Sequence, residues 1–154
     1  MKVNQFFHYI SYLQYPFMLV ALFYAFKPIL GFDFASLELS DLLGGVNNML
    51  VFMGLSVSFS SLQDTTKTQN EVSRKVWEDP KKGKIFIAMI TTVTFICITV
   101  GLLGYFVLHD TGLRELSFGL TTFGVGLIGL LKAAIEMFEN HRLDKNLPAA
   151  ASSE

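Results

Sequence analysis

Four long apolar stretches, separated by polar connections, dominate the pattern of residues along the chain. A bilayer core of about 30 Å requires about 20 apolar residues in a helix that rises 1.5 Å per residue. The stretches that meet or nearly meet this requirement lie at about residues 9–29, 42–62, 85–108 and 116–137. The sequence therefore predicts an all-α integral membrane protein in which four transmembrane helices form an up-down bundle.

The segments that connect the four spans are expected to belong to the same domain as the spans. The chain has 154 residues, which is too short for more than one ordinary domain, and we expect residues 1–147 to form one membrane domain. The connection 63–84 predicts a helical extension of the second span that ends at Asp79-Pro80. On such a helix Val72, Val76 and Trp77 would rest on the headgroup layer. The small and polar residues of 148–154 predict a disordered end or an added linker.

Small and hydroxyl residues recur at spacings of three and four on every predicted span. Helices associate in lipid through close contact, so such stripes mark contact faces, and we expect all four to face the inside of the bundle. The stripe of the fourth span is the longest. The members are Gly119, Thr122, Gly126, Gly129 and Ala133; Thr94, Cys97, Gly101 and Gly104; Gly44, Asn47, Gly54, Ser58 and Ser61; and Ser11, Gln14, Ala21 and Ala25.

Two interpretations of these stripes differ in function. Either they are packing seams, within the chain or between copies, or their polar members line a wet path. These polar members are Gln14, Asn47, Asn48, Ser56 and Ser58. Hydrogen bonding to a neighbouring helix is the ordinary explanation for Asn47, and coordination of an ion or solute is the alternative. We favour packing, because a pore needs a continuous polar lining and the outer half of the fourth span offers only threonines.

Composition and charge narrow the class of protein. Hydrophobic residues make up 51% of the chain and charged residues 16%, which agrees with a membrane protein. The formal net charge of −1 argues against a nucleic-acid partner, because binding to phosphates needs a concentrated positive field. The single cysteine, Cys97, excludes a disulfide framework built from this chain alone.

Basic residues predict the orientation in the membrane. They gather on the connection between the second and third spans, whereas the connection "GFDFASLELSD" has none. Since cytoplasmic loops carry the excess of lysine and arginine, we expect both termini inside, in a bacterial inner membrane. These charges either set the topology alone or also bind anionic lipid headgroups at 63–84. They are Lys67, Arg74, Lys75, Lys81, Lys82 and Lys84.

A lysine and a glutamate lie four residues apart near the end of the fourth span. Sixteen residues, about 24 Å of helix, separate Glu115 from Lys132, so we expect Lys132 within the hydrocarbon. Its Cα–Cβ bond leans toward the helix N-terminus, away from the nearer surface, which favours pairing with Glu136 over reaching water. Glu136 continues the small-residue stripe and should face protein. The pair is either a static anchor or a site for an ion or partner.

Catalytic and metal-binding patterns are missing from the sequence. It contains no H-E-x-x-H motif, phosphate-binding glycine loop or nucleophile elbow. The histidines His8, His109 and His141 fall near opposite edges of the predicted membrane, which excludes one three-histidine site within a chain. We expect no enzyme, no metal and no cofactor.

The abundance of seams and the lack of catalytic groups favour one function. We expect a binding or scaffolding subunit that associates through its small-residue seams, either with itself or with other membrane proteins. The alternative is a homo-oligomeric ion channel or small transporter that uses Asn47, Asn48 and the Lys132–Glu136 pair.

Overall fold

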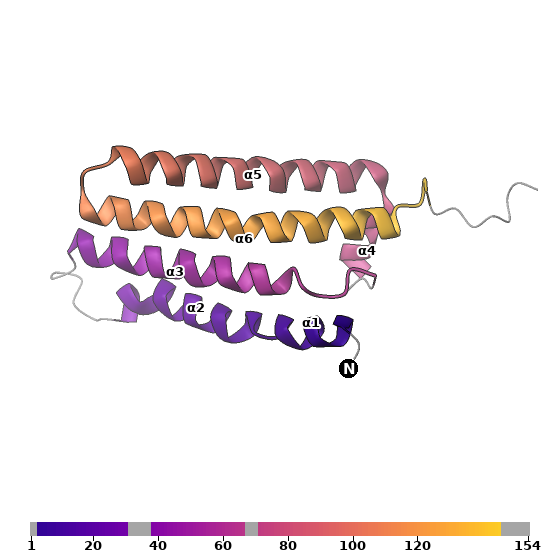
Figure 1. Cartoon of the computed structure of the whole chain (residues 1–154), viewed down its shortest axis with the longest axis horizontal. Helices are drawn as coiled ribbons and strands as arrows, with labels where there is room; N and C mark the ends of the chain where they lie inside the picture. The colour runs from indigo at the N-terminus through magenta and orange to yellow at the C-terminus, as the bar shows by residue number, and fades with distance from the viewer. Residues whose placement is uncertain (1–2, 31–37, 67–70, 146–154) are drawn as a thin grey trace, which may run out of the picture.

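The computed structural model describes residues 3–30, 38–66 and 71–145 (Figure 1). Within these ranges the chain is helical and contains no strand. The predicted tail at 148–154 lies outside the described residues. The helices are α1 Val3–Ser11, α2 Gln14–Leu30, α3 Leu39–Ser60, α4 Glu71–Glu78, α5 Pro80–Val107 and α6 Thr111–His141.

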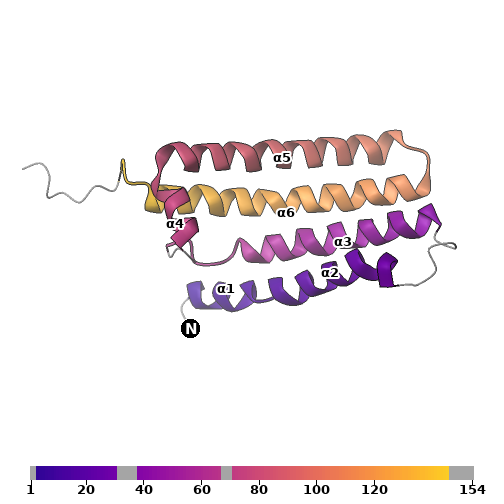
Figure 2. The ribbon, with the colours of Figure 1, turned by 180° about the vertical axis from the view of Figure 1, so that it is seen from behind.

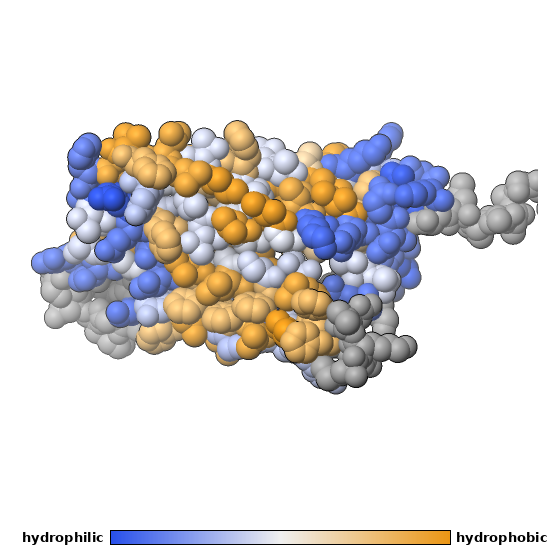
Figure 3. Space-filling model, in the orientation of Figure 1, coloured by the Kyte–Doolittle hydropathy of each residue, from blue (hydrophilic) through white to orange (hydrophobic). Residues whose placement is uncertain are grey.

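Four helical segments are long and apolar enough to cross a membrane, which confirms the predicted number of spans. They are Phe6–Lys27, Leu39–Ser60, Pro80–Val107 and Thr111–His141. The last two exceed the predicted ranges because their helices continue through polar residues at the ends. In the space-filling view hydrophilic residues gather at the two ends of the molecule, and hydrophobic residues cover much of the surface between them (Figure 3).

A break at Tyr12 and Leu13 divides the first span into α1 and α2. Pro16 explains its position, because proline has no N–H to donate to the carbonyl four residues earlier and its ring crowds that carbonyl. This carbonyl belongs to Tyr12, which instead accepts a hydrogen bond from the N–H of Tyr15 at 3.1 Å. The first span is therefore interrupted at Tyr12 and Leu13, where the sequence predicted one helix.

The long helices lie in a row, in the order α2, α3, α6, α5 (Figures 1 and 2). The extensive contacts join α2 to α3, α3 to α6 and α6 to α5. The helices form a bundle as predicted, but their four stripes do not face one centre as we expected. The physical reason lies in α6, which presents small residues on two faces and so takes a close neighbour on each side.

Glycine contacts give the relative directions of the helices. Gly101 of α5 lies against Thr121 and Gly83 lies against Phe138, so α5 and α6 are antiparallel. Asn47 of α3 lies against Gly119, and Gly54 lies against Gly126, so α3 and α6 are parallel. Helices α3 and α6 are thus direct neighbours in the middle of the row, although no short loop joins them.

The connection after α3 is not the predicted helical extension. α3 ends at Ser60, and the Asp64 carboxylate then accepts hydrogen bonds from both the N–H and the hydroxyl of Thr66, at 3.0 and 2.6 Å. Such side-chain bonds to nearby backbone compete with helix formation. Asp79 caps α5 by accepting from Lys81 N–H at 2.9 Å, with Pro80 at the first helical position.

A hydrophobic cluster joins α4 to α5 and α6. It contains Trp77, Ile90, Ala134 and Phe138, and Trp77 is only 6% exposed. The ring of Phe138 lies directly on Gly83, where a Cβ would overlap it. The prediction that Trp77 rests on headgroups is wrong, because α4 folds back onto the ends of α5 and α6. We call this end of the molecule the α4 end, and the opposite end, where α5 connects to α6, the turn end.

Candidate functional site

The stripe predicted on α6 faces α3. Gly119 lies against Asn47, and a Cβ on Gly126 would overlap the backbone carbonyl of Gly54. A Cβ on Gly129 would lie 2.8 Å from the Ser61 hydroxyl. Thr122 and Ala133, the other members, are half-buried. The two backbones therefore approach closely along this α3–α6 seam.

A second seam, between α5 and α6, uses residues that sequence reasoning missed. Gly101 and Gly104 of α5 lie against Ser117 and Thr121 of α6, and Gly124 of α6 lies against Ile98 and Cys97. Ser117 and Gly124 are buried, as is Thr94 of α5. The signal was present in the sequence, because 117, 121 and 124 also follow spacings of four and three, on another side of the helix.

Hydroxyl groups along these seams are satisfied locally. Each donates its proton to a carbonyl of its own helix, at 2.7–2.9 Å, so this proton is not donated to a neighbouring helix. Ser56 is different, because its hydroxyl donates to the backbone carbonyl of Gln14 in α2 at 2.9 Å. The locally bonded residues are Ser58, Ser61, Thr94, Ser117, Thr121 and Thr122.

Aromatic rings, together with the predicted small residues, join α2 to α3. Phe17 stacks on Phe59 with ring centroids 5.4 Å apart, and Tyr24 stacks on Phe52 at 5.8 Å. Ser11, Gln14 and Ala21 of the predicted stripe are buried, and Ala25 is half-buried. Gln14 thus lies within a helix contact and not on an open path.

The two asparagines lie in the first half of α3, more than two turns from its start. The Oδ1 atom of Asn47 is buried against Gly119 and has no hydrogen-bond partner. The hydrogen bond that we expected from Asn47 to a neighbouring helix is therefore not formed at this oxygen, since α6 presents only a glycine there. Asn48, the next residue, is half-buried.

Lys132 and Glu136 form an ion pair on α6, with Nζ and Oε1 2.8 Å apart. Their side chains are 76% and 45% exposed, so the pair lies on the surface, whereas we expected Glu136 to face protein. Gly129 is beside Ser61, and α3 runs parallel to α6, so Lys132 lies level with the connection just beyond the end of α3. Its neighbours on the same exposed face are apolar: Val125, Ile128 and Ile135.

A pocket of about 320 Å³ opens at the turn end. It lies where α3, α5 and the first turns of α6 meet. The Arg114 guanidinium lies over the ring of Tyr105, 5.2 Å from its centroid, which holds this cation at the pocket wall. The lining residues are Asn47, Tyr105, Thr111, Arg114, Glu115 and Phe118.

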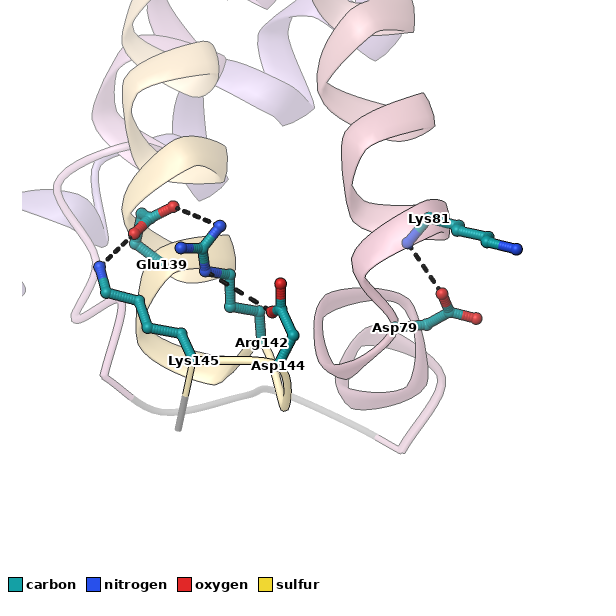
Figure 4. Close-up of polar contacts among 6 residues, drawn as sticks. All are labelled: Asp79, Lys81, Glu139, Arg142, Asp144 and Lys145. Carbon is teal, nitrogen blue, oxygen red and sulfur yellow. Dashed lines mark hydrogen bonds and ion pairs between the residues drawn. The ribbon is translucent and has the colours of Figure 1, made fainter. Parts of the chain in front are cut away.

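Charged residues at the α4 end form local networks (Figure 4). Glu139 accepts from Lys145 at 2.6 Å and lies 3.3 Å from Arg142, which also faces Asp144 at 3.7 Å. Hydrogen bonds from the N–H groups of Lys81 and Lys82 lower the pKa of Asp79. Among the predicted lipid-binding residues, Arg74, Lys75, Lys81, Lys82 and Lys84 are exposed, and Lys67 lies outside the described residues.

The histidines lie apart from one another. His8 of α1 is within 3.4 Å of the Tyr12 hydroxyl, His141 lies 2.9 Å from the carbonyl of Met137, and His109 is exposed at the turn end. In the part of the chain that the structure describes, no group of three or more His, Cys, Asp or Glu residues could hold a metal ion.

Comparison of the chain with protein-family models, with curated proteins and with solved structures gives no match. Two features of the described residues could meet a partner or a ligand: the exposed face around Lys132 and the pocket at the turn end.

Proposed function

We propose that the protein is a small membrane subunit that binds other membrane chains, including copies of itself. The observation that carries the proposal is the exposed Lys132–Glu136 ion pair on an otherwise apolar helix face. Charged residues in membrane helices usually face protein or a polar cavity, because exposure to lipid is costly. A partner that covers this face would meet both charges.

The surface proposed to bind a partner differs from the small-residue seams that the sequence predicted for this role. The two glycine seams are occupied by contacts within the chain, so they are not free for a partner. Exposed residues instead follow spacings of three, four and three along α6, which is the repeat of a helix-to-helix contact. We call these residues the open face of α6: Val125, Ile128, Lys132 and Ile135.

Reciprocal pairing makes a second copy a suitable partner. In a twofold contact the same face meets itself, and Lys132 of one copy can approach Glu136 of the other at a similar depth. The depth matches because both copies have the same orientation in the membrane. We infer from the basic connections that the α4 end is cytoplasmic. The bacterial inner membrane stays a prediction.

Cysteine cross-linking in native membranes tests the proposal. In a Cys97→Ser background, Ile128→Cys should give a disulfide-linked product upon mild oxidation, and Lys132→Gln should reduce its yield. Leu103→Cys, on the exposed side of α5, is the matched control. A product with Ile128→Cys at the mass of two chains identifies self-association, and a different mass identifies another subunit. A monomer with Ile128→Cys, or equal yields at both positions, would contradict the proposal.

Flux measurements distinguish the proposed subunit from the alternative function, an ion channel or small transporter. A channel or transporter that uses Asn47, Asn48 and the ion pair should conduct protons or ions when purified protein is placed in liposomes, and Glu136→Gln should abolish the flux. The locally bonded hydroxyls of both seams argue against a wet path through the row. Flux that depends on Glu136 would replace the subunit proposal by the channel.

A further inference from the structure

The pocket at the turn end has the placement of a site for an amphipathic ligand. Thr111 is the first residue of α6, and Phe118 lies seven residues further along, about 10 Å deeper. The headgroup layer on each side of a bilayer is only about 5–8 Å thick. The pocket therefore reaches from the headgroup layer into the edge of the hydrocarbon.

Two opposite charges at the pocket have no ion-pair partner among the described residues. No carboxylate of the described residues forms an ion pair with Arg114, and no described cation forms one with Glu115. This contrasts with the α4 end, where Glu139 is shared by Lys145 and Arg142. A guanidinium and a carboxylate that both line one pocket, neither of them in an ion pair with a described residue, suit a ligand that carries both signs of charge.

The other residues that line the pocket further restrict the kind of ligand that it can bind. The Asn47 amide and the Thr111 hydroxyl add hydrogen-bonding groups, and Tyr105 and Phe118 add apolar wall. Phe118 is 54% exposed, so the wall continues onto the lipid-facing surface. A volume of about 320 Å³ is at the lower end for small-molecule sites, which fits a headgroup and not a whole lipid.

We propose that this pocket binds the phosphoethanolamine group of a phospholipid or of a free solute. The Arg114 guanidinium donates to the phosphate oxygens, a pairing that its planar fork favours. The Glu115 carboxylate accepts hydrogen bonds from the primary ammonium, and the start of an acyl chain lies against Phe118.

This arrangement discriminates among common headgroups. A trimethylammonium group has no N–H to donate to Glu115, so phosphocholine loses that bond. Phosphoglycerol carries no positive charge and would leave Glu115 unpaired beside the phosphate. Arg114 therefore contacts the phosphate that all three headgroups share, and the preference among them depends on Glu115.

Lipid binding by the full chain tests the site. Protein in detergent is titrated with phosphatidylethanolamine, phosphatidylcholine and phosphatidylglycerol of the same acyl chains, and bound lipid is counted by native mass spectrometry. We expect Kd for the ethanolamine lipid to be about tenfold lower than for the other two, since charge-assisted hydrogen bonds separate them. Arg114→Gln should weaken binding of all three lipids, and Glu115→Gln should remove the preference over the choline lipid.

Lys27→Gln is the matched control, because Lys27 is an exposed cation near the end of α2 and is not part of the pocket. Free phosphoethanolamine distinguishes the two sources of the group: competition at a similar concentration identifies a solute site, and no competition identifies a lipid site. Equal Kd values for the three lipids, or unchanged preference in both pocket variants with helix content intact, would overturn the proposal.

Discussion

Single glycines set how closely α3 and α6 approach. A Cβ on Gly126 would overlap the carbonyl of Gly54, and a Cβ on Gly54 would lie 2.8 Å from the carbonyl oxygen of Thr122. These are backbone atoms, which cannot turn aside as the end of a flexible side chain can. Close contact at these two positions is therefore available only to glycine.

Gly126→Ala is expected to lower the free energy of unfolding by about 1–3 kcal/mol, as overpacking does. Gly44→Ala is the matched control, because a Cβ at Gly44 meets nothing within 4 Å. This control should raise stability by about 0.5–1 kcal/mol through the better helix propensity of alanine. Reversible unfolding in mixed micelles, followed by circular dichroism, measures both. A shift in the same direction for both variants would contradict the role of the seam.

At the scale of elements, α4 is held by the cluster around Trp77. The indole N–H donates to the Ser73 hydroxyl at 2.9 Å, and its ring lies edge-on to Phe86, 5.3 Å between centroids. Helix α4 has only eight residues, which is marginal for an isolated helix. Contact with α5 and α6 therefore stabilises it.

Trp77 is the only tryptophan and so reports on this contact. We expect its fluorescence to resist quenching by lipids that carry brominated chains and by aqueous acrylamide, because protein surrounds it. Phe138→Ala should expose the ring and increase quenching by one or both agents. Strong lipid quenching of the unchanged protein would instead favour a tryptophan resting on the membrane.

The stability of the first turn of α5 depends on pH through the Asp79 carboxylate. Its folded pKa is lowered by the N–H groups of Lys81 and Lys82, so its stabilising effect is present above the ordinary pKa of aspartate and is lost as pH falls through the folded pKa. Amide exchange at Lys81 and Lys82 should therefore become faster, relative to unstructured amides, as the pH falls below about 4.

Two variants check the origin of this pH dependence. Asp79→Asn keeps an acceptor without a titrating charge, so protection should persist at low pH. Asp79→Ala should lose this protection at every pH, because alanine has no side-chain acceptor. Asp110→Ala is the control, because Asp110 caps α6 through the Leu113 N–H and should leave the Lys81 amide unchanged. An unaltered pH profile in Asp79→Asn would contradict the assignment.

The whole molecule is an open row, with α2 and α5 at its edges. Both edge helices expose large apolar residues, and the described residues contain few buried hydrophobic side chains. Lipid or other chains must cover these surfaces. Small residues at the centre of the row and large apolar residues at its edges follow the same physical requirement, close contact inside and solvation by lipid outside.

Cysteine labelling tests the orientation of the whole molecule. Since basic residues gather at the α4 end, a reagent that cannot cross the membrane should label His109→Cys, at the turn end, in intact cells. It should label Thr66→Cys, at the α4 end, only after lysis. Both variants carry Cys97→Ser, and both positions are exposed. The reverse pattern of labelling would overturn the proposed topology.

Local patterns in the sequence determined the number and place of the spans, because hydropathy is summed over consecutive residues. They also determined that Lys132 and Glu136 are neighbours, since residues four apart always are on a helix. The i,i+4 ion pair and the small-residue faces of α5 and α6 could thus be anticipated from the printed sequence. The helical extension after α3 could not, because hydrogen bonds to the Asp64 side chain and the contacts of Trp77 compete with it.

Tertiary structure alone decided which helices became neighbours. Periodicity shows that a helix face carries small residues, but it does not show which helix packs against that face. Helix α6 has two such faces, one for α3 and one for α5. The row follows from that choice, and so do the burial of Trp77 and the exposure of Lys132. The pocket around Arg114 also depends on it, because its walls come from three helices that only long-range contact brings together.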